Sequence, residues 1–178
     1  MKKALFAISC YFVCFSTSCN DKKSSETTTT TTNSDKNLIA VHAINKAIET
    51  GDVSKLGDYI TIDGVDHSGP RGEVRGLDSI KAELANIHNM ASDMKATTIK
   101  ELADSEYVFQ WMRFTGTTLT EDMGMPKGTK FDMNALEVSK FNKDGKSTEH
   151  WEFIQPSDMM KMMQSHEGAM ENKVDTAR

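Results

Sequence analysis

A carboxylate and a histidine are the side chains of this sequence best suited to proton transfer. Glu149 lies in a strand-like stretch beside Trp151, and apolar surroundings that desolvate a carboxylate raise its pKa toward neutrality. His67 follows a short strand next to a glycine-rich loop, where an imidazole is suited to shuttling protons. Each has a structural alternative: Glu149 would pair with Arg113 or a backbone amide, which is the favoured interpretation, and His67 would hold the loop.

Strand alternation separates the side chains around Glu149 into two faces. One face, which we predict to point into a pocket, holds Glu149, Trp151, Phe153 and Gln155. Two earlier strand-like stretches add candidate pocket-wall residues, namely Phe109, Trp111, Phe131 and Met133. An apolar cavity with few polar groups suits a small hydrophobic ligand. The same pattern is also what a half-buried sheet requires without any ligand.

The remaining histidines do not indicate a metal site. His42 and His88 fall in helical stretches, and His166 lies near the C-terminus. His67 and His150 are far apart in the sequence, and no His-x-x-x-His spacing or carboxylate cluster accompanies them. We therefore expect neither a metal nor another cofactor.

Charge and cysteine content restrict the class of protein. The chain has 178 residues and a formal net charge of -5, without a basic stripe, which argues against nucleic-acid binding. Its cysteines, Cys10, Cys14 and Cys19, all lie close to the N-terminus. The rest of the chain therefore has no disulfide and depends on a hydrophobic core, for which a single domain of this length suffices.

The N-terminal segment predicts export and a membrane anchor. Residues 1–18 combine Lys2 and Lys3 with an apolar stretch and small residues, the order of a secretory signal peptide. The apolar stretch is too short to span a bilayer as a helix. Ser16-Thr17-Ser18-Cys19 resembles the bacterial lipobox, in which the cysteine is acylated and becomes the new N-terminus. The alternative is ordinary secretion with Cys19 as a free thiol.

A polar segment follows the proposed acylation site. Residues 19–36 include six consecutive threonines and almost nothing apolar, so we predict a flexible tether. We expect a lipoprotein of the bacterial cell envelope, held to the membrane through lipidated Cys19. The choice between the inner and the outer membrane stays open.

Hydrophobic periodicity predicts helices first and strands afterwards within a domain at residues 37–165. The predicted helices cover residues 37–50, 56–59, 78–91 and 158–164, with a brief strand at 60–62 and a loop at 63–76. Four longer strands are predicted at 94–102, 106–120, 129–142 and 147–155, and a frayed tail at 166–178. Asp144-Gly145 marks a hairpin turn. This order favours an α+β domain with helices on one face of a curved antiparallel sheet.

Several local motifs occur in an order that is typical of one family. They are Val65-Asp66-His67, Arg75-Gly76, Trp111 to Gly116, Met125 to Gly128, and Asp144-Gly145-Lys146 leading to Glu149-His150-Trp151. From about Leu38 to Met163 the sequence resembles the SnoaL-like branch of the nuclear transport factor 2-like superfamily. The resemblance implies a cone-shaped fold, in which a bent sheet wraps helices around an open-ended apolar pocket. Members include polyketide cyclases and domains that only bind ligands, so the fold leaves the function open.

The resemblance also bears on catalysis. In the cyclases it implies the pattern Glu-x-Trp-x-x-x-Asp, whose aspartate is the general acid and base. Gln155 takes that place here, and an amide does not exchange a proton near neutral pH. The leading hypothesis is therefore a domain that binds a small apolar ligand without cyclase activity. The alternatives are an isomerase, cyclase or hydrolase that uses Glu149 and His67, and a structural envelope module that forms a homodimer through its sheet.

Overall fold

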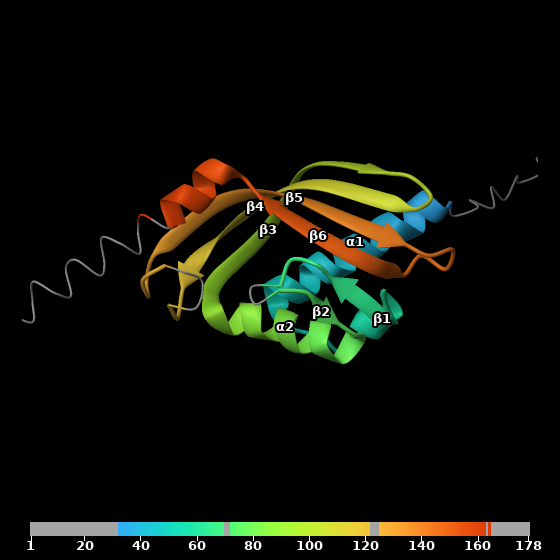
Figure 1. The fold of residues 1–178 in the computed structure, drawn as a ribbon, viewed down its shortest axis with the longest axis horizontal. Helices are drawn as coiled ribbons and strands as arrows, with labels where there is room; N and C mark the ends of the chain where they lie inside the picture. The colour runs from blue at the N-terminus through green and yellow to red at the C-terminus, as the bar shows by residue number, and fades with distance from the viewer. Residues whose placement is uncertain (1–31, 70–71, 122–124, 163, 165–178) are drawn as a thin grey trace, which may run out of the picture. The chain divides into compact units, whose positions relative to one another are not determined.

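The computed structural model describes residues 32–69, 72–121, 125–162 and 164 (Figure 1). The predicted signal peptide, Cys19, most of the tether and the C-terminal tail lie outside the described residues. None of the helices in the described ranges combines the length and the hydropathy that a membrane-spanning segment needs.

Two α-helices and a short 3-10 helix precede the long strands. They are α1 (Asn33–Thr50), η1 (Leu56–Asp58) and α2 (Leu77–Met90). Helix α1 begins earlier than predicted because Thr32 and Asp35 form a reciprocal capping box, which satisfies two backbone amides at the helix start. The helix ends where the sequence predicts, at Gly51, which adopts the left-handed conformation that glycine tolerates best.

Six strands form one sheet in the order β2-β1-β6-β5-β4-β3. Their bounds are β1 (Ile60–Asp66), β2 (Val74–Arg75), β3 (Ala91–Ala103), β4 (Tyr107–Thr118), β5 (Lys130–Phe141) and β6 (Ser147–Ile154). The four long strands are confirmed with small shifts at their ends. Strand β1 pairs with β6 in parallel, so the sheet is mixed and the prediction of a wholly antiparallel sheet is wrong. This pairing also extends β1 into residues that were predicted as loop.

The helices cover one face of the bent sheet, which confirms the α+β class (Figure 1). Helix α1 packs on β3 and β4, and α2 packs on β1 and β3. Alternation on β4 separates buried Val108 and Met112 from exposed Phe109 and Trp111. A core cluster that includes Leu56, Ile60, Ile80 and Leu84 joins both helices to β1. The helix-covered face of the sheet is therefore the one that can enclose a ligand.

Candidate functional site

A cavity of about 330 Å³ lies between the helices and the covered face of the sheet. Most of its wall is apolar, with side chains from both helices and the long strands, including Ile44, Ile48, Leu84, Met90, Phe114 and Met133. This volume is at the lower end of the range of roughly 300–1,000 Å³ that small-molecule sites occupy. The cavity therefore has room for a small, largely apolar molecule.

Four carboxyl residues and one histidine interrupt this apolar wall. Glu83 comes from α2, and the others come from the sheet. Asp66 ends β1, Glu137 lies on β5, and His150 and Glu152 lie on β6. The strand register brings them together, since Asp66 is paired with His150 and Glu137 is paired with Glu152. Because His150 and Glu152 are two residues apart on one strand, their side chains share the face that lines the cavity.

His150 is held between two carboxylates. Its Nδ1 lies 3.2 Å from Asp66 Oδ1 and its Nε2 lies 2.6 Å from Glu137 Oε2. Burial acts to lower the pKa of His150, but the hydrogen bonds and charges of both carboxylates outweigh it and raise the pKa to about 10. At neutral pH the ring is thus an imidazolium that donates both N–H groups to the protein. For Asp66, burial acts to raise the pKa, and the contacts with His150 lower it overall.

The surroundings of Glu152 favour its neutral form, whereas those of His150 favour the charged form. Burial raises the pKa of Glu152 to about 7, the charges of Glu137 and Asp66 act in the same direction, and His150 opposes them. Ser68 Oγ accepts a hydrogen bond from the backbone N–H of Glu152, which fixes the strand at this point. A carboxyl group with a pKa near neutrality can both accept and release a proton in the physiological range.

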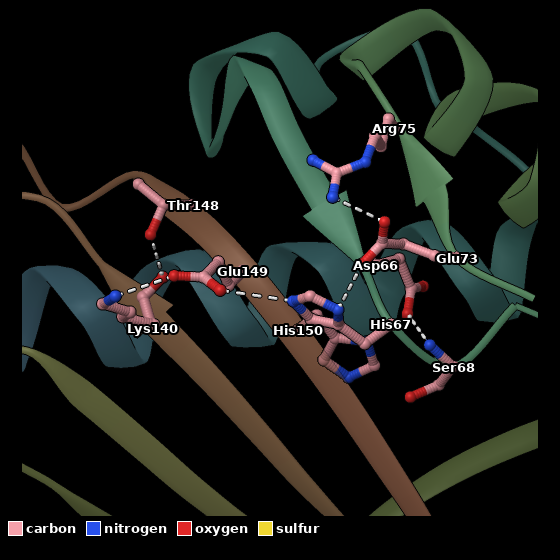
Figure 2. A network of polar contacts seen from close by, with 9 residues as sticks. All are labelled: Asp66, His67, Ser68, Glu73, Arg75, Lys140, Thr148, Glu149 and His150. Atoms are coloured by element: carbon pink, nitrogen blue, oxygen red, sulfur yellow. Dashed lines mark hydrogen bonds and ion pairs between the residues drawn. The ribbon is translucent and has the colours of Figure 1, made fainter.

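Glu149 and His67 do not line the cavity. The structure brings them together elsewhere, with His67 Nε2 at 3.2 Å from Glu149 Oε2 and His67 Nδ1 at 2.7 Å from Glu73 Oε2 (Figure 2). Hydrogen bonds from Lys140 and His67 lower the pKa of Glu149. The raised pKa predicted for Glu149 is therefore wrong. Its ion-pair partner is Lys140, at 2.7 Å, rather than the expected arginine.

The predicted pocket face of β6 is also wrong. The cavity takes His150, Glu152 and Ile154 from this strand, so the set Glu149, Trp151, Phe153 and Gln155 lies on the outer face. Alternation defines two faces of a strand but does not say which one is covered. The large apolar side chains of Trp151 and Phe153 led to the prediction that their face is the covered one. The covered face instead carries His150 and Glu152, and His150 is paired there with Asp66 and Glu137.

The pocket-wall residues predicted on β4 and β5 divide between the two faces. Met133 lines the cavity as predicted. Phe131 is buried in the core next to it, but it is not a lining residue. Phe109 and Trp111 are 42% and 52% exposed on the outer face. Trp111, Phe153 and Gln155 line a shallow depression there, which is separate from the cavity.

We did not predict Asp66, Glu137, His150 or Glu152 as site residues. One signal was present in the sequence, because Glu137 interrupts an alternating inner face of Met133, Ala135 and Ser139. A charged residue at such a position is rarely buried without a partner. Across the described parts of the chain, no group of His, Cys, Asp and Glu has the arrangement of a metal site.

Comparison with known proteins identifies the family. Residues 38–164 match the model of the SnoaL-like polyketide cyclase family, and the chain belongs to this family. Comparison with curated proteins gives no match.

Solved structures share the fold at low sequence identity. IdmH from Streptomyces antibioticus is 24% identical, with a TM-score of 0.60 over 72% of this chain and 98% of that chain. TsrD from Streptomyces laurentii is 16% identical, with a TM-score of 0.63 over 73% and 96% of the two chains. A SnoaL-like polyketide cyclase from Agrobacterium tumefaciens is 14% identical, with a TM-score of 0.61 over 75% and 99%. These likenesses establish the fold.

Proposed function

We propose that the domain binds a small, largely apolar molecule in the cavity and transfers a proton to or from it through Glu152. The observation that carries this proposal is the position of Glu152 on the cavity wall with a pKa of about 7. Both forms of the carboxyl group are then populated at neutral pH, as a general acid and base requires.

Three charged neighbours, His150, Glu137 and Asp66, act on Glu152 through their charges. His150, with a pKa of about 10, stays charged and holds Glu137 and Asp66 in place through its two N–H groups. Glu137 in turn lies opposite Glu152 on the neighbouring strand. Its negative charge keeps the proton of Glu152 bound up to a higher pH.

This proposal differs from the expectation of binding without catalysis. That expectation relied on Gln155, an amide where the related cyclases have their acidic residue. Gln155 does not line the cavity, whereas Glu152 does and offers a carboxyl group of suitable pKa. Binding without proton transfer is the second candidate, and it is supported by the mostly apolar wall.

The test begins with the ligand. We would purify the full-length protein from its own host in detergent and identify any co-purifying small molecule by native mass spectrometry. The isolated ligand would then be incubated with the protein in deuterated water, and its uptake of deuterium at carbon would be measured for the native chain and for Glu152→Gln. We expect exchange by the native chain and a loss of about a hundredfold or more in the variant.

The same experiment separates the two candidates. A ligand that co-purifies but takes up no deuterium with the native chain supports binding alone. Exchange that is equally fast with Glu152→Gln contradicts the role of Glu152.

We also propose that the protein is a lipoprotein of the bacterial envelope, anchored through Cys19. The support is the sequence of residues 1–36. Because α1 begins at Asn33, residues 19–32 would let the domain move up to roughly 50 Å from the membrane if fully extended. Metabolic labelling with an alkyne fatty acid tests this, since Cys19→Ser should lose the label and Cys14→Ser should keep it.

A further inference from the structure

We propose that the cavity selects ligands whose polar end is a neutral or cationic hydrogen-bond donor, such as a hydroxyl or an amine, and that it rejects carboxylates and phosphates. This inference rests on the proposed function, because it concerns the ligand of the same cavity. It follows from the charges, the hydrogen bonds and the free acceptor atoms of the wall.

The charges of the wall are mostly negative. Four carboxyl residues line the cavity, namely Asp66, Glu83, Glu137 and Glu152. Its single cationic lining residue within the described ranges is His150, and no lysine or arginine is among them. Charge repulsion is strong where water is scarce. An anionic ligand would therefore meet an unfavourable potential over most of the wall.

The imidazolium of His150 is not available to an anionic ligand. Both ring nitrogens of His150 are occupied, at 3.2 Å by Asp66 and at 2.6 Å by Glu137. A ligand carboxylate could bind the imidazolium only by displacing one of these partners. That exchange would leave a partly buried protein carboxylate without its counter-charge, which is costly.

The carboxyl groups of the wall keep acceptor atoms that the protein does not use. Among the described residues, the hydrogen bond of Glu152 involves its backbone N–H rather than its carboxylate. Glu137 binds His150 through Oε2, and Asp66 binds both His150 and the backbone of Ser68 through Oδ1. Within the described ranges, the second oxygens of Asp66 and Glu137 and both side-chain oxygens of Glu152 remain available. A ligand that supplies donors complements them.

The amides of the wall do not reverse this balance. Gln110 lies opposite Glu137 on the next strand, and its side chain already accepts from Asn45 and donates to Glu101, at 3.2 Å and 2.9 Å. The sheet therefore presents a row in which the amide is engaged with Asn45 and Glu101, while Glu137 uses only Oε2 for His150 and the printed bond of Glu152 is made by its backbone. Donor groups of a ligand would be recognised along this row.

Three probes with the same two-ring body test the inference. They are 2-naphthylmethanol, 2-naphthylmethylamine and 2-naphthoate, which carry a neutral, a cationic and an anionic polar end. Their affinities for the purified full-length protein would be measured by isothermal titration calorimetry at neutral pH. We expect the alcohol and the amine to bind at least about tenfold more tightly than the naphthoate.

Two variants locate the effect. Glu152→Gln should reduce the advantage of the amine over the naphthoate by about tenfold, because it removes one carboxylate from the wall. Glu106→Gln is the matched control, since Glu106 is an exposed residue between β3 and β4 and should leave the ratio unchanged. Thermal unfolding would verify that both variants are folded.

The possible failures can be told apart. Naphthoate binding as tightly as the amine would overturn the selection of donors but leave proton transfer by Glu152 in place. If Glu152→Gln and Glu106→Gln reduce the preference for the amine equally, the preference does not arise in the cavity, and the inference is overturned. Failure of all three probes to bind would count against the cavity as a ligand site, and the proposed function would fall with the inference.

Discussion

Asp66 and His67 are neighbours in the sequence whose side chains serve different parts of the molecule. Asp66 lines the cavity and accepts from His150, at 3.2 Å. His67 bonds to Glu73 and Glu149 instead (Figure 2). Its ring also stacks on Trp151, with ring centroids 4.7 Å apart. The contacts of His67 therefore hold the chain segment that also carries Asp66 and Ser68.

The first prediction concerns this outer cluster. His67→Ala should lower the free energy of unfolding by about 1 kcal/mol, because partly exposed ion pairs and ring stacking each contribute modestly. It should also lower the pKa of His150, because Asp66 would be held less firmly. Chemical denaturation and nitrogen-15 NMR of the His150 ring measure the two effects. Arg75→Ala, which removes an exposed partner of Glu73, should leave the His150 ring signals unchanged.

A second prediction concerns the charge beside the proposed acid and base. Glu137→Gln should lower the pKa of Glu152 below about 7, because it removes the negative charge that helps to keep the carboxyl group protonated. The pH profile of deuterium exchange into the bound ligand should shift to lower pH. A profile that keeps its position would show that Glu137 does not set the pKa of the exchanging group.

The third prediction concerns stability at alkaline pH. The folded-state pKa of His150, about 10, exceeds its ordinary value of 6.5, so the folded chain binds the extra proton more tightly than the unfolded chain does. The contribution of protonated His150 to the stability of the fold is complete below about pH 6.5, and it is lost as the pH rises through about 10. Glu152 also lowers the stability of the fold as the pH rises from its ordinary pKa of 4.5 to its folded-state pKa of about 7.

This prediction is measured by thermal unfolding between neutral pH and about pH 9.5. The native chain should lose on the order of a few kcal/mol over this range. His150→Asn should be less stable at neutral pH and lose much less as the pH rises. Parallel curves for the two proteins would argue against the raised pKa of His150.

A fourth prediction tests Glu149, which the sequence offered as a candidate for proton transfer. Glu149→Gln should leave deuterium exchange into the ligand within about twofold of the native rate, because Glu149 does not line the cavity. Its main effect should be a loss of about 1 kcal/mol or less from the ion pairs with Lys140 and His67. A loss of exchange comparable to that of Glu152→Gln would return Glu149 to the catalytic role.

The outer face of the sheet gives the fifth prediction. Trp111, Leu136 and Phe153 occupy one register row across β4, β5 and β6, and all three are exposed. Exposed apolar groups of this kind often mark association surfaces. We expect a homodimer through this face, which Trp111→Asp should weaken in sedimentation experiments. A monomer at all concentrations would remove this expectation.

The sequence predicted the elements well because their signals are local. The helical spacing around Leu84 and the Asp144-Gly145 turn act within a few residues, and both are found where they were expected. The parallel pairing of β1 with β6 was missed because it joins residues as distant as Asp66 and His150. No local pattern encodes such a pairing.

The site was predicted less well for the same reason. The family resemblance directed attention to the correct strand, but the choice of face depended on what covers the sheet. His150 and Glu152 are acceptable on the covered face only because Asp66 and Glu137 arrive from two other strands. Within the sequence of a single strand, burying His150 or Glu152 looks unfavourable because no partner is visible. In the folded sheet the neighbouring strands supply the partners.

The most direct test of the account is the titration of Glu152 itself. The side-chain carboxyl carbon of Glu152 would be followed by carbon-13 NMR over the full pH range, with Glu152→Gln used to assign the signal. We expect a midpoint near 7, shifted to lower pH in Glu137→Gln. A midpoint near the ordinary value of 4.5 would contradict it, because Glu152 would then be permanently ionised at neutral pH and unable to donate a proton.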